Sequence, residues 1–508
     1  MRKRNLSLLV LVALILFATA ATANQPKYVF FLVGDGMSTS QIQATEAYLT
    51  TVNGGSAREA EDLLKTENRL NLSKMPVAGI QTTYDAHALM TDSASAGTAF
   101  ACGIKTLSGV IGMDDSKTKS YKSIAQLAKE QGRKVGIISS VSLDHATPAS
   151  YYASVPSRSH MNNIGTQMAA TGYEFFGGGG LARPTSGGSG DTNNNVWDLL
   201  AANGYEVRDT RESILALKNN PRDKVVCINP WLQDSAAMPY EIDRINTQNT
   251  NLSLAEMTEV AIANLYSRRG GKGFFIMVEG GKIDWACHAN DAMAAIHDTL
   301  DFDRAVGVAL AFLKKHPMET LIVVTGDHET GGMSIGHATT AYTAYYDKLL
   351  GQKNSFQYFG ANQWPAHKQA TAGSVCGSHL TTENLAADGT MIGLMQSVFG
   401  LEYGSLNAFQ KKKLEDAYDK SMCGNNNNSD PENTYLYGGY EPIIVTITHI
   451  LNENASIGWT SYSHTGVPVP VFAQGRDAHK FGGFYDNTDI AKKLAKVMGI
   501  RATLPVEK

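Results

Sequence analysis

Residues 29–35 read VFFLVGD, residues 274–279 read FFIMVE, and residues 321–328 read LIVVTGDH. In each of these three stretches a short apolar run, without polar alternation, ends at an acidic residue. Such runs are typical of strands that are buried on both faces, as in a parallel α/β sheet. The sequence therefore predicts an α/β fold with a doubly wound, mostly parallel central sheet and helices on both faces.

The acidic residues that end the three runs are Asp35, Glu279 and Asp327, and Asp327 is followed by His328. In open α/β sheets, ligands bind beyond the carboxyl ends of the strands, so these side chains are expected to lie close together. Carboxylates gathered in one place repel each other and resist ionisation unless cations neutralise them. An acid after a strand can also cap a helix, but three of them favour a site for divalent metal ions.

The rest of the chain divides into a core and an insertion. Strand-like and helix-like segments alternate from residue 28 to about 330, with strands expected at 134–139 and within 172–180, and one long helix at 291–315. Residues 337–462 are instead rich in Tyr, Asn, Gln and Ser, and only EPIIVTITHI (441–450) there resembles a buried strand. We therefore expect a core of residues 24–336 and 463–508, interrupted by an insertion at 337–462. Long insertions are often functional, although a decorative loop is an alternative.

The first 23 residues are expected to be a signal peptide. Basic residues at positions 2–4 precede an apolar stretch from Leu8 to Phe17, and Ala21-Thr22-Ala23 forms a small-residue cleavage site. The apolar stretch is short for a membrane span, which needs roughly 18 residues or more. The product is expected to be exported, to the periplasm or the medium, with no membrane anchor.

The net charge limits the possible binding partners, and the cysteine content bears on which cysteines form a disulfide. The formal net charge is −4, which gives no electrostatic case for binding nucleic acid or an anionic membrane. The five cysteines are an odd number for an oxidising compartment. Cys376 and Cys423 share one loop-rich stretch and are the expected disulfide, whereas Cys102 and Cys287 have small and apolar neighbours and are expected to be buried thiols.

Residues 91–103, TDSASAGTAFACG, are dense in small helix formers and place Ser93 at or near the start of a helix. The free N–H groups and the dipole at a helix N-terminus favour an anion, either a phosphate group or the alkoxide of a serine. The alternative is that Ser93 only caps its helix.

A second cluster, EGGKIDWACHAND at 279–291, contains Asp284 and His288. If this segment is helical, the two residues are i, i+4 neighbours on one face and can hold one metal ion between them. His464, in SYSHTG, has no comparable neighbour in the sequence, and by itself it would be interpreted as a surface or structural histidine.

Six motifs together resemble the alkaline phosphatase family, in its order and contexts and across the whole expected core. They are GDGM at 34–37, TDSASAGTA at 91–99, DHATPAS at 144–150 with Arg158 beyond it, EGGKIDWACH at 279–288, TGDHETGG at 325–332 and SHTG at 463–466. The resemblance implies hydrolysis of phosphate monoesters through a covalent phosphoserine, releasing inorganic phosphate and an alcohol, with an alkaline pH optimum.

Carried over residue by residue, the resemblance implies two zinc ions and one magnesium ion. The first zinc would be held by Asp284, His288 and His464. The second would be held by Asp35, Asp327, His328 and the Ser93 oxygen. Asp35 would bridge to the magnesium site, which Thr147 and Glu279 complete. Mixed nitrogen and oxygen ligands suit zinc, and an all-oxygen set suits magnesium.

The resemblance also implies three residues at the substrate. Arg158 would bind two phosphate oxygens through its planar guanidinium. His145 and Trp285 occupy positions where family members differ, with Asp and Lys as other common choices. The metal affinity of the magnesium site and the pH profile of the enzyme are therefore not carried over from relatives that have Asp and Lys at these positions.

Rival functions differ in which of these features they require. Phosphodiesterases of the superfamily generally lack the magnesium set, sulfatases need a formylglycine precursor that TDSASAG does not resemble, and sugar-phosphate mutases are usually cytosolic. A metal-binding or adhesion protein on a degenerate scaffold would typically have lost a ligand or the nucleophile. The family is usually homodimeric, and the insertion is long enough to form a crown over the active sites or an arm around a partner.

Overall fold

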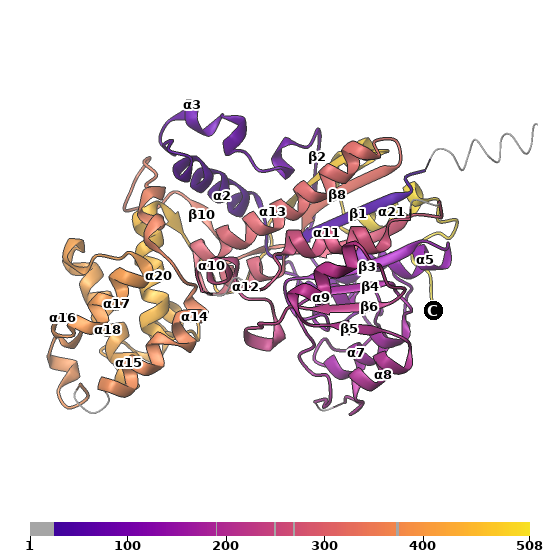
Figure 1. Cartoon of the computed structure of the whole chain (residues 1–508). Helices are drawn as coiled ribbons and strands as arrows, with labels where there is room; N and C mark the ends of the chain where they lie inside the picture. The colour runs from indigo at the N-terminus through magenta and orange to yellow at the C-terminus, as the bar shows by residue number, and fades with distance from the viewer. Residues whose placement is uncertain (1–24, 189, 248–249, 268–269, 372–374) are drawn as a thin grey trace, which may run out of the picture.

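The computed structural model describes residues 25–188, 190–247, 250–267, 270–371 and 375–508. Its centre is a ten-stranded sheet in the order β14-β2-β13-β8-β1-β7-β3-β4-β6-β5 (Figure 1). The strands are β1 Tyr28–Gly34, β2 Val77–Gln81, β3 Lys134–Ser139, β4 Phe175–Gly178, β5 Glu206–Arg208, β6 Val225–Ile228, β7 Phe274–Glu279, β8 Thr320–Gly326, β13 Val469–Gly475 and β14 Gly483–Tyr485.

The sheet is mostly parallel, as predicted. The three acid-ended runs are β1, β7 and β8, which lie side by side at its centre, and every residue of them is buried. Only β13 runs against its neighbours, pairing antiparallel with β8 and with β2. The expected strands at 134–139 and within 172–180 are β3 and β4.

Helices cover both faces of the sheet, because alternate residues of each strand point to opposite sides. Tyr28, Phe30 and Leu32 pack with α2 (Thr39–Val52), α11 (Leu254–Leu265) and α13 (Ala292–Lys315). Val29 and Phe31 pack on the opposite side with α4 (Ser93–Cys102), α5 (Ile124–Glu130), α7 (Met161–Ala170) and α21 (Thr488–Met498). The doubly wound α/β prediction is therefore confirmed.

Shorter helices lie in the connections of the core, and α12 occupies the one after β7. They are α3 Ala60–Leu63, α6 Ala146–Ala149, α8 Val196–Ala202, α9 Arg211–Leu215, α10 Glu241–Asn246 and α12 Lys282–His288.

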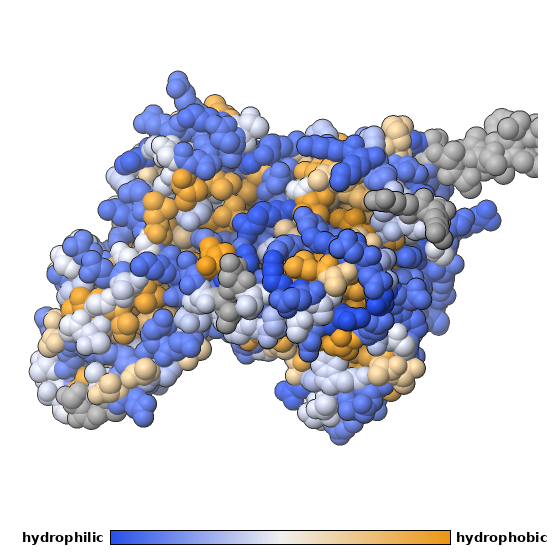
Figure 2. Space-filling model, in the orientation of Figure 1, coloured by the Kyte–Doolittle hydropathy of each residue, from blue (hydrophilic) through white to orange (hydrophobic). Residues whose placement is uncertain are grey.

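The chain leaves the core after β10 (Ser334–Ile335) and returns at β11 (Ile457–Gly458), and these two short strands pair with each other. Between them lies a helical lobe, drawn in orange at the left of Figure 1, with a hydrophobic cluster of its own. Figure 2 shows a notch between this lobe and the lower part of the core. The lobe comprises α14 Phe356–Ala361, α15 Gln363–Thr371, α16 Asn384–Ala387, α17 Gly389–Phe399, α18 Ala408–Cys423, α19 Asp430–Tyr437 and α20 Pro442–Ala455.

The strand-like run at 441–450 is in fact the first part of helix α20. A continuous apolar run fits a buried helix as well as a buried strand, and Pro442 occupies the first turn, where its missing N–H costs nothing. The predicted Cys376–Cys423 disulfide is present and lies in the lobe, and Cys102, Cys227 and Cys287 are buried thiols.

The predicted signal peptide, residues 1–23, lies outside the described residues. Within the part of the chain that the structure describes, no helix combines the length and the apolar character that crossing a membrane requires.

Candidate active site

The carboxyl ends of the three central strands bring the predicted acidic residues together. In the register of the sheet, Val33 lies beside Glu279, and Gly34 lies beside Gly326, which Asp327 follows. Asp35, Glu279 and Asp327 are all fully buried. The expected gathering of three carboxylates at this edge is therefore observed.

Ser93 and His328 lie against these carboxylates. The Ser93 hydroxyl is 3.4 Å from Asp35 Oδ1 and 3.4 Å from His328 Nε2. His328 Nε2 is in turn 3.3 Å from an oxygen of Asp35 and 3.3 Å from an oxygen of Asp327. Three acceptors and one hydroxyl thus converge on one small volume, which is the arrangement that a tetrahedral cation site requires.

Ser93 does not cap its helix. The N-cap of α4 is Asp92, whose Oδ1 accepts a hydrogen bond from the backbone N–H of Ser95 at 2.9 Å. Ser93 is the first helical residue, so its hydroxyl does not make the capping hydrogen bond, and it lies at the positive end of the helix dipole. The capping alternative is therefore wrong.

A second group of oxygens lies on the other side of Asp35. The Thr147 hydroxyl donates to Asp35 Oδ2 at 3.2 Å, and the Ser139 hydroxyl donates to Glu279 Oε2 at 2.5 Å. Oε1 of Glu279 is buried without a hydrogen-bond partner in the structure. A buried carboxylate oxygen without a donor is costly, so this atom marks a place that a cation suits.

The pKa values of these acids reflect their crowding. Burial, followed by the charges of Asp327 and Asp284, raises the pKa of Asp35 well above its usual value. Burial raises the pKa of Asp327 to about 7, and it raises the pKa of Glu279 to about 8. Carboxyl groups with such raised pKa values resist ionisation at neutral pH unless a cation neutralises them, which favours a metal site here.

Asp284, His288 and His464 form a second cluster. Asp284 lies 3.4 Å from His288 Nε2 and 3.4 Å from His464 Nε2, and the two histidine nitrogens are 3.1 Å apart. As predicted, Asp284 and His288 lie one turn apart on a helix, α12.

The hydrogen bonds of the two histidines assign their tautomers. His288 Nδ1 lies 2.6 Å from the carbonyl oxygen of Tyr462, and His464 Nδ1 lies 2.7 Å from that of Thr91. Each Nδ1 must therefore carry a hydrogen, so in the neutral rings both Nε2 atoms present lone pairs to each other. Burial opposes a charge on His288, but Asp284 outweighs it and raises the pKa of His288 to about 9. The cluster therefore favours a positive charge between its ligands.

The strand order explains how His464 reaches this site. Because β13 is antiparallel, its beginning lies at the edge where the parallel strands end. His464 precedes that beginning, in the short strand β12 (His464–Thr465), which pairs with β9 (Glu329–Thr330) directly after His328. The rings of His328 and His464 stack with their centroids 3.6 Å apart.

Arg158 lies beside Asp92, the N-cap of α4, and beside His145. The guanidinium of Arg158 donates to Asp92 Oδ2 and to His145 Nε2, each at 2.9 Å. Burial, followed by the charge of Arg158, lowers the pKa of His145 to about 3, so its ring is neutral. The ring of Trp285 packs edge-on against that of His145, with centroids 5.8 Å apart. The structure thus brings together all twelve site residues that the sequence analysis named.

Two residues that the sequence did not point to, Thr330 and Glu329, lie against the ligands or beside them. Thr330 donates to Asp284 at 2.5 Å and lies 3.2 Å from His328 Nδ1, so it contacts a member of each cluster. The buried Glu329 accepts hydrogen bonds from Gln41, from Met333 and from Thr465, beside His464. The TGDHETGG motif contains both residues, but nothing in its pattern separates them from other polar loop residues.

Geometry alone groups the ligands slightly differently from the resemblance. Among the residues that the structure describes, three triads could each hold a metal ion. They are Asp35, Asp327 and His328; Asp284, His328 and His464; and Asp35, His145 and Glu279. His328 is thus shared between the two proposed zinc clusters, and His145 lies near the expected magnesium site as well as at Arg158.

Known proteins are similar in sequence to this chain along nearly its whole length. The family model for alkaline phosphatase matches residues 26–500. The chain belongs to the alkaline phosphatase family. It is 31% identical to alkaline phosphatase 4 of Bacillus subtilis, over 92% of this chain and 88% of that protein.

Solved structures of alkaline phosphatases are similar to this chain in fold. The alkaline phosphatase of Thermus thermophilus superposes with a TM-score of 0.72 at 26% identity, covering 95% of this chain and 93% of that one. The cold-active alkaline phosphatase of the psychrophile Shewanella sp. gives a TM-score of 0.69 at 27% identity, covering 93% of this chain and 99% of that one. The chain is therefore a phosphomonoesterase of a metal-dependent family, with candidate ligand clusters for the metal ions.

Proposed function

We propose that this enzyme hydrolyses phosphate monoesters through a covalent phosphoserine on Ser93, with two zinc ions and one magnesium ion. The observation that carries the proposal is the position of the Ser93 hydroxyl. It lies at the N-terminus of α4, 3.4 Å from both Asp35 and His328, at the centre of a buried ligand set. A serine oxygen so placed is suited to attack phosphorus in line while the helix dipole favours its negative charge.

The clusters suggest which residues would hold each metal. Asp284, His288 and His464 fit one zinc, and the second fits Asp35, Asp327, His328 and Ser93. Asp35, Thr147 and Glu279 fit magnesium. Bound there, the metals would lower the pKa of the serine hydroxyl and neutralise charge on the transferring phosphoryl group. His145, which contacts Arg158, and Trp285, which packs against His145, would contact the substrate.

Arg158 would bind the phosphate, and Arg158→Lys tests this role. Asp92 and His145 fix its guanidinium, and a planar fork binds two phosphate oxygens where an ammonium binds as a point charge. We expect the KM for p-nitrophenyl phosphate and the Ki for inorganic phosphate each to rise about tenfold. Arg222→Lys, at an exposed ion pair with Glu206, is the matched control. Equal Ki values for wild type and Arg158→Lys would remove Arg158 from the phosphate site.

The type of ester separates this function from its rivals. The oxygens of Asp35, Thr147 and Glu279 converge, which favours monoesters over the diesters of related two-zinc enzymes. We expect kcat/KM for p-nitrophenyl phosphate to exceed that for bis(p-nitrophenyl) phosphate and for p-nitrophenyl sulfate by on the order of 10³-fold. A preference for the diester or the sulfate would overturn the assignment.

We further propose that the protein is exported, to the periplasm or the medium, and that it forms a homodimer. The division into a core of residues 24–336 and 463–508 and an insertion of 337–462 is supported by the separate hydrophobic cluster of the lobe. The insertion would serve as a crown or an arm. Sedimentation of a variant that lacks residues 340–455 distinguishes the two, since an unchanged dimer rules out an essential arm.

A further inference from the structure

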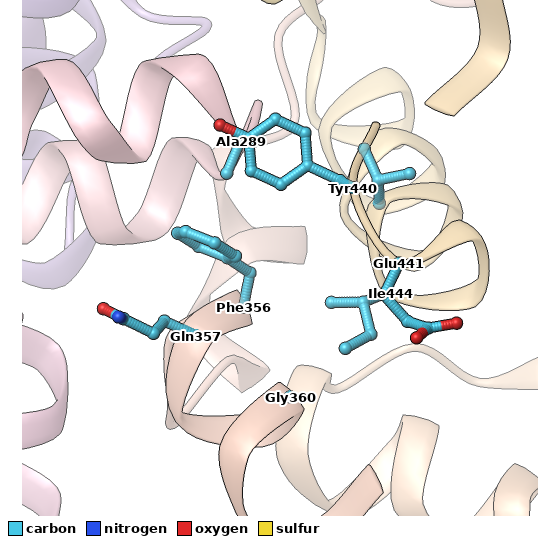
Figure 3. A pocket seen from close by; sticks show the side chains of 8 residues that line it. Ala289, Phe356, Gln357, Gly360, Tyr440, Glu441 and Ile444 are labelled. Atoms are coloured by element: carbon cyan, nitrogen blue, oxygen red, sulfur yellow. The ribbon is translucent and has the colours of Figure 1, made fainter. Parts of the chain in front are cut away.

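A cavity of about 180 Å³ lies where the end of α12 meets α14 and α20 (Figure 3). Most of its wall is apolar. The residues that matter here are Ala289, Phe356, Gln357, Tyr440 and Ile444. An apolar cavity of about 150 Å³ in another protein binds benzene, so this one has room for a single aromatic ring.

The cavity adjoins the ligand cluster of Asp284, His288 and His464. Ala289, in its wall, directly follows His288 in the chain. The ring of Tyr440 stacks on that of Tyr462 with centroids 5.9 Å apart, and the carbonyl oxygen of Tyr462 accepts the hydrogen bond from His288.

A buried lysine links the cavity to the residues at the phosphate. Lys282 Nζ lies 3.2 Å from Gln357 Oε1, in the cavity wall, and 4.9 Å from the centre of the Trp285 ring. Trp285 packs in turn against His145, the partner of Arg158. A chain of three side chains, Lys282, Trp285 and His145, therefore links the cavity wall to Arg158.

Buried carboxylates of the core hold the lobe side of the cavity in place. Asp243 accepts hydrogen bonds from the backbone N–H of Ser355 at 2.8 Å and from its hydroxyl at 2.6 Å. Asp291 accepts one from the backbone N–H of Phe356 at 2.8 Å. Both acids are fully buried, so their hydrogen bonds fix the segment that positions Phe356 to the core.

We propose that this cavity binds an aromatic ring carried by the alcohol part of the phosphate ester. The preferred substrates would be monoesters of alcohols with one aromatic ring a few bonds from the ester oxygen. This inference rests on the proposed function, and it makes the lobe a determinant of specificity. Phe356 and Tyr440 offer the ring edge-on or stacked contacts, and Ile444 adds an aliphatic part of the wall.

Two esters of similar chemical reactivity test the proposal, namely 2-phenylethyl phosphate and ethyl phosphate. Both leaving groups are primary alkoxides, so the ratio of their kcat/KM values reports binding of the ring. We expect the wild-type enzyme to favour 2-phenylethyl phosphate about tenfold. In Ile444→Phe the added ring fills the cavity, and the ratio should fall close to one. Leu394→Phe adds the same bulk in the lobe, at a residue that does not line the cavity, and should keep the ratio.

If Ile444→Phe does not fold, Phe356→Leu decides, because it removes an aromatic wall and should lower the ratio two- to threefold. A wild-type ratio near one would overturn the proposal, as would a tenfold ratio that persists in folded Ile444→Phe. Failure of the proposed function is distinguishable, because neither ester would then be hydrolysed.

Discussion

Ser93→Ala is expected to lower kcat for p-nitrophenyl phosphate by on the order of 10³-fold or more. The substitution removes the oxygen that lies between Asp35 and His328, and alanine leaves the helix otherwise intact because Asp92 supplies the cap. Helix α4 should therefore form normally, so the loss would report chemistry rather than folding. Steady-state kinetics together with thermal unfolding of each variant provide the measurement.

Ser150→Ala is the matched control for this loss. Ser150 is also buried, and its hydroxyl donates to the backbone carbonyl oxygen of Ala146 rather than to a proposed metal ligand. Its turnover should stay within a few-fold of wild type. Near wild-type turnover by Ser93→Ala would mean that the nucleophile is another group.

Removal of the metal ions should abolish activity and make thermal stability depend on pH. In the metal-free protein, burial raises the pKa of Asp327 to about 7 and that of Glu279 to about 8, whereas unfolded Asp and Glu titrate at about 4. An acid whose pKa is raised in the folded state does not lower the free energy of unfolding at pH values below its unfolded pKa. As pH rises from about 4 to about 8, the free energy of unfolding decreases progressively, and above this interval the loss is constant.

The melting temperature of chelated enzyme should therefore fall by several degrees between pH 5 and pH 8, while enzyme with zinc and magnesium restored should show a smaller change. Asp327→Asn is the matched variant, since it removes one crowded charge and should weaken the pH dependence of the metal-free protein. Full activity after exhaustive dialysis against chelator would contradict the metal centre. So would identical pH dependence with and without metal.

The strand pattern predicted one part of the site from physical reasoning alone. Asp35, Glu279 and Asp327 each end a buried parallel strand, and parallel strands end at one edge, so their meeting could be inferred without any family. The same reasoning could not find His464. His464 precedes β13, which pairs antiparallel with both of its neighbours in the sheet. The pattern of apolar residues in a sequence does not reveal whether a strand is parallel or antiparallel.

Other features of the structure could not be predicted from the sequence, each for a different physical reason. Thr330 donates a hydrogen bond to Asp284, and Glu329 accepts one from Thr465, beside His464. These partners are distant in the chain, and such contacts leave no periodic pattern in the sequence. The helix α20 was ambiguous because an apolar run of ten residues suits either secondary structure. The cavity between the lobe and the core depends on how Asp243 and Asp291 anchor residues 355 and 356, which only the folded chain reveals.

The phosphoserine itself is the most direct test of the central claim. Enzyme with zinc and magnesium would be mixed with radiolabelled inorganic phosphate at mildly acidic pH, where the phosphoenzyme is expected to accumulate, then quenched in strong acid and digested for peptide mass spectrometry. We expect one phosphate on the peptide that contains Ser93, and none in Ser93→Ala. Label on another residue, or no covalent label in enzyme that hydrolyses phosphate monoesters, would contradict it.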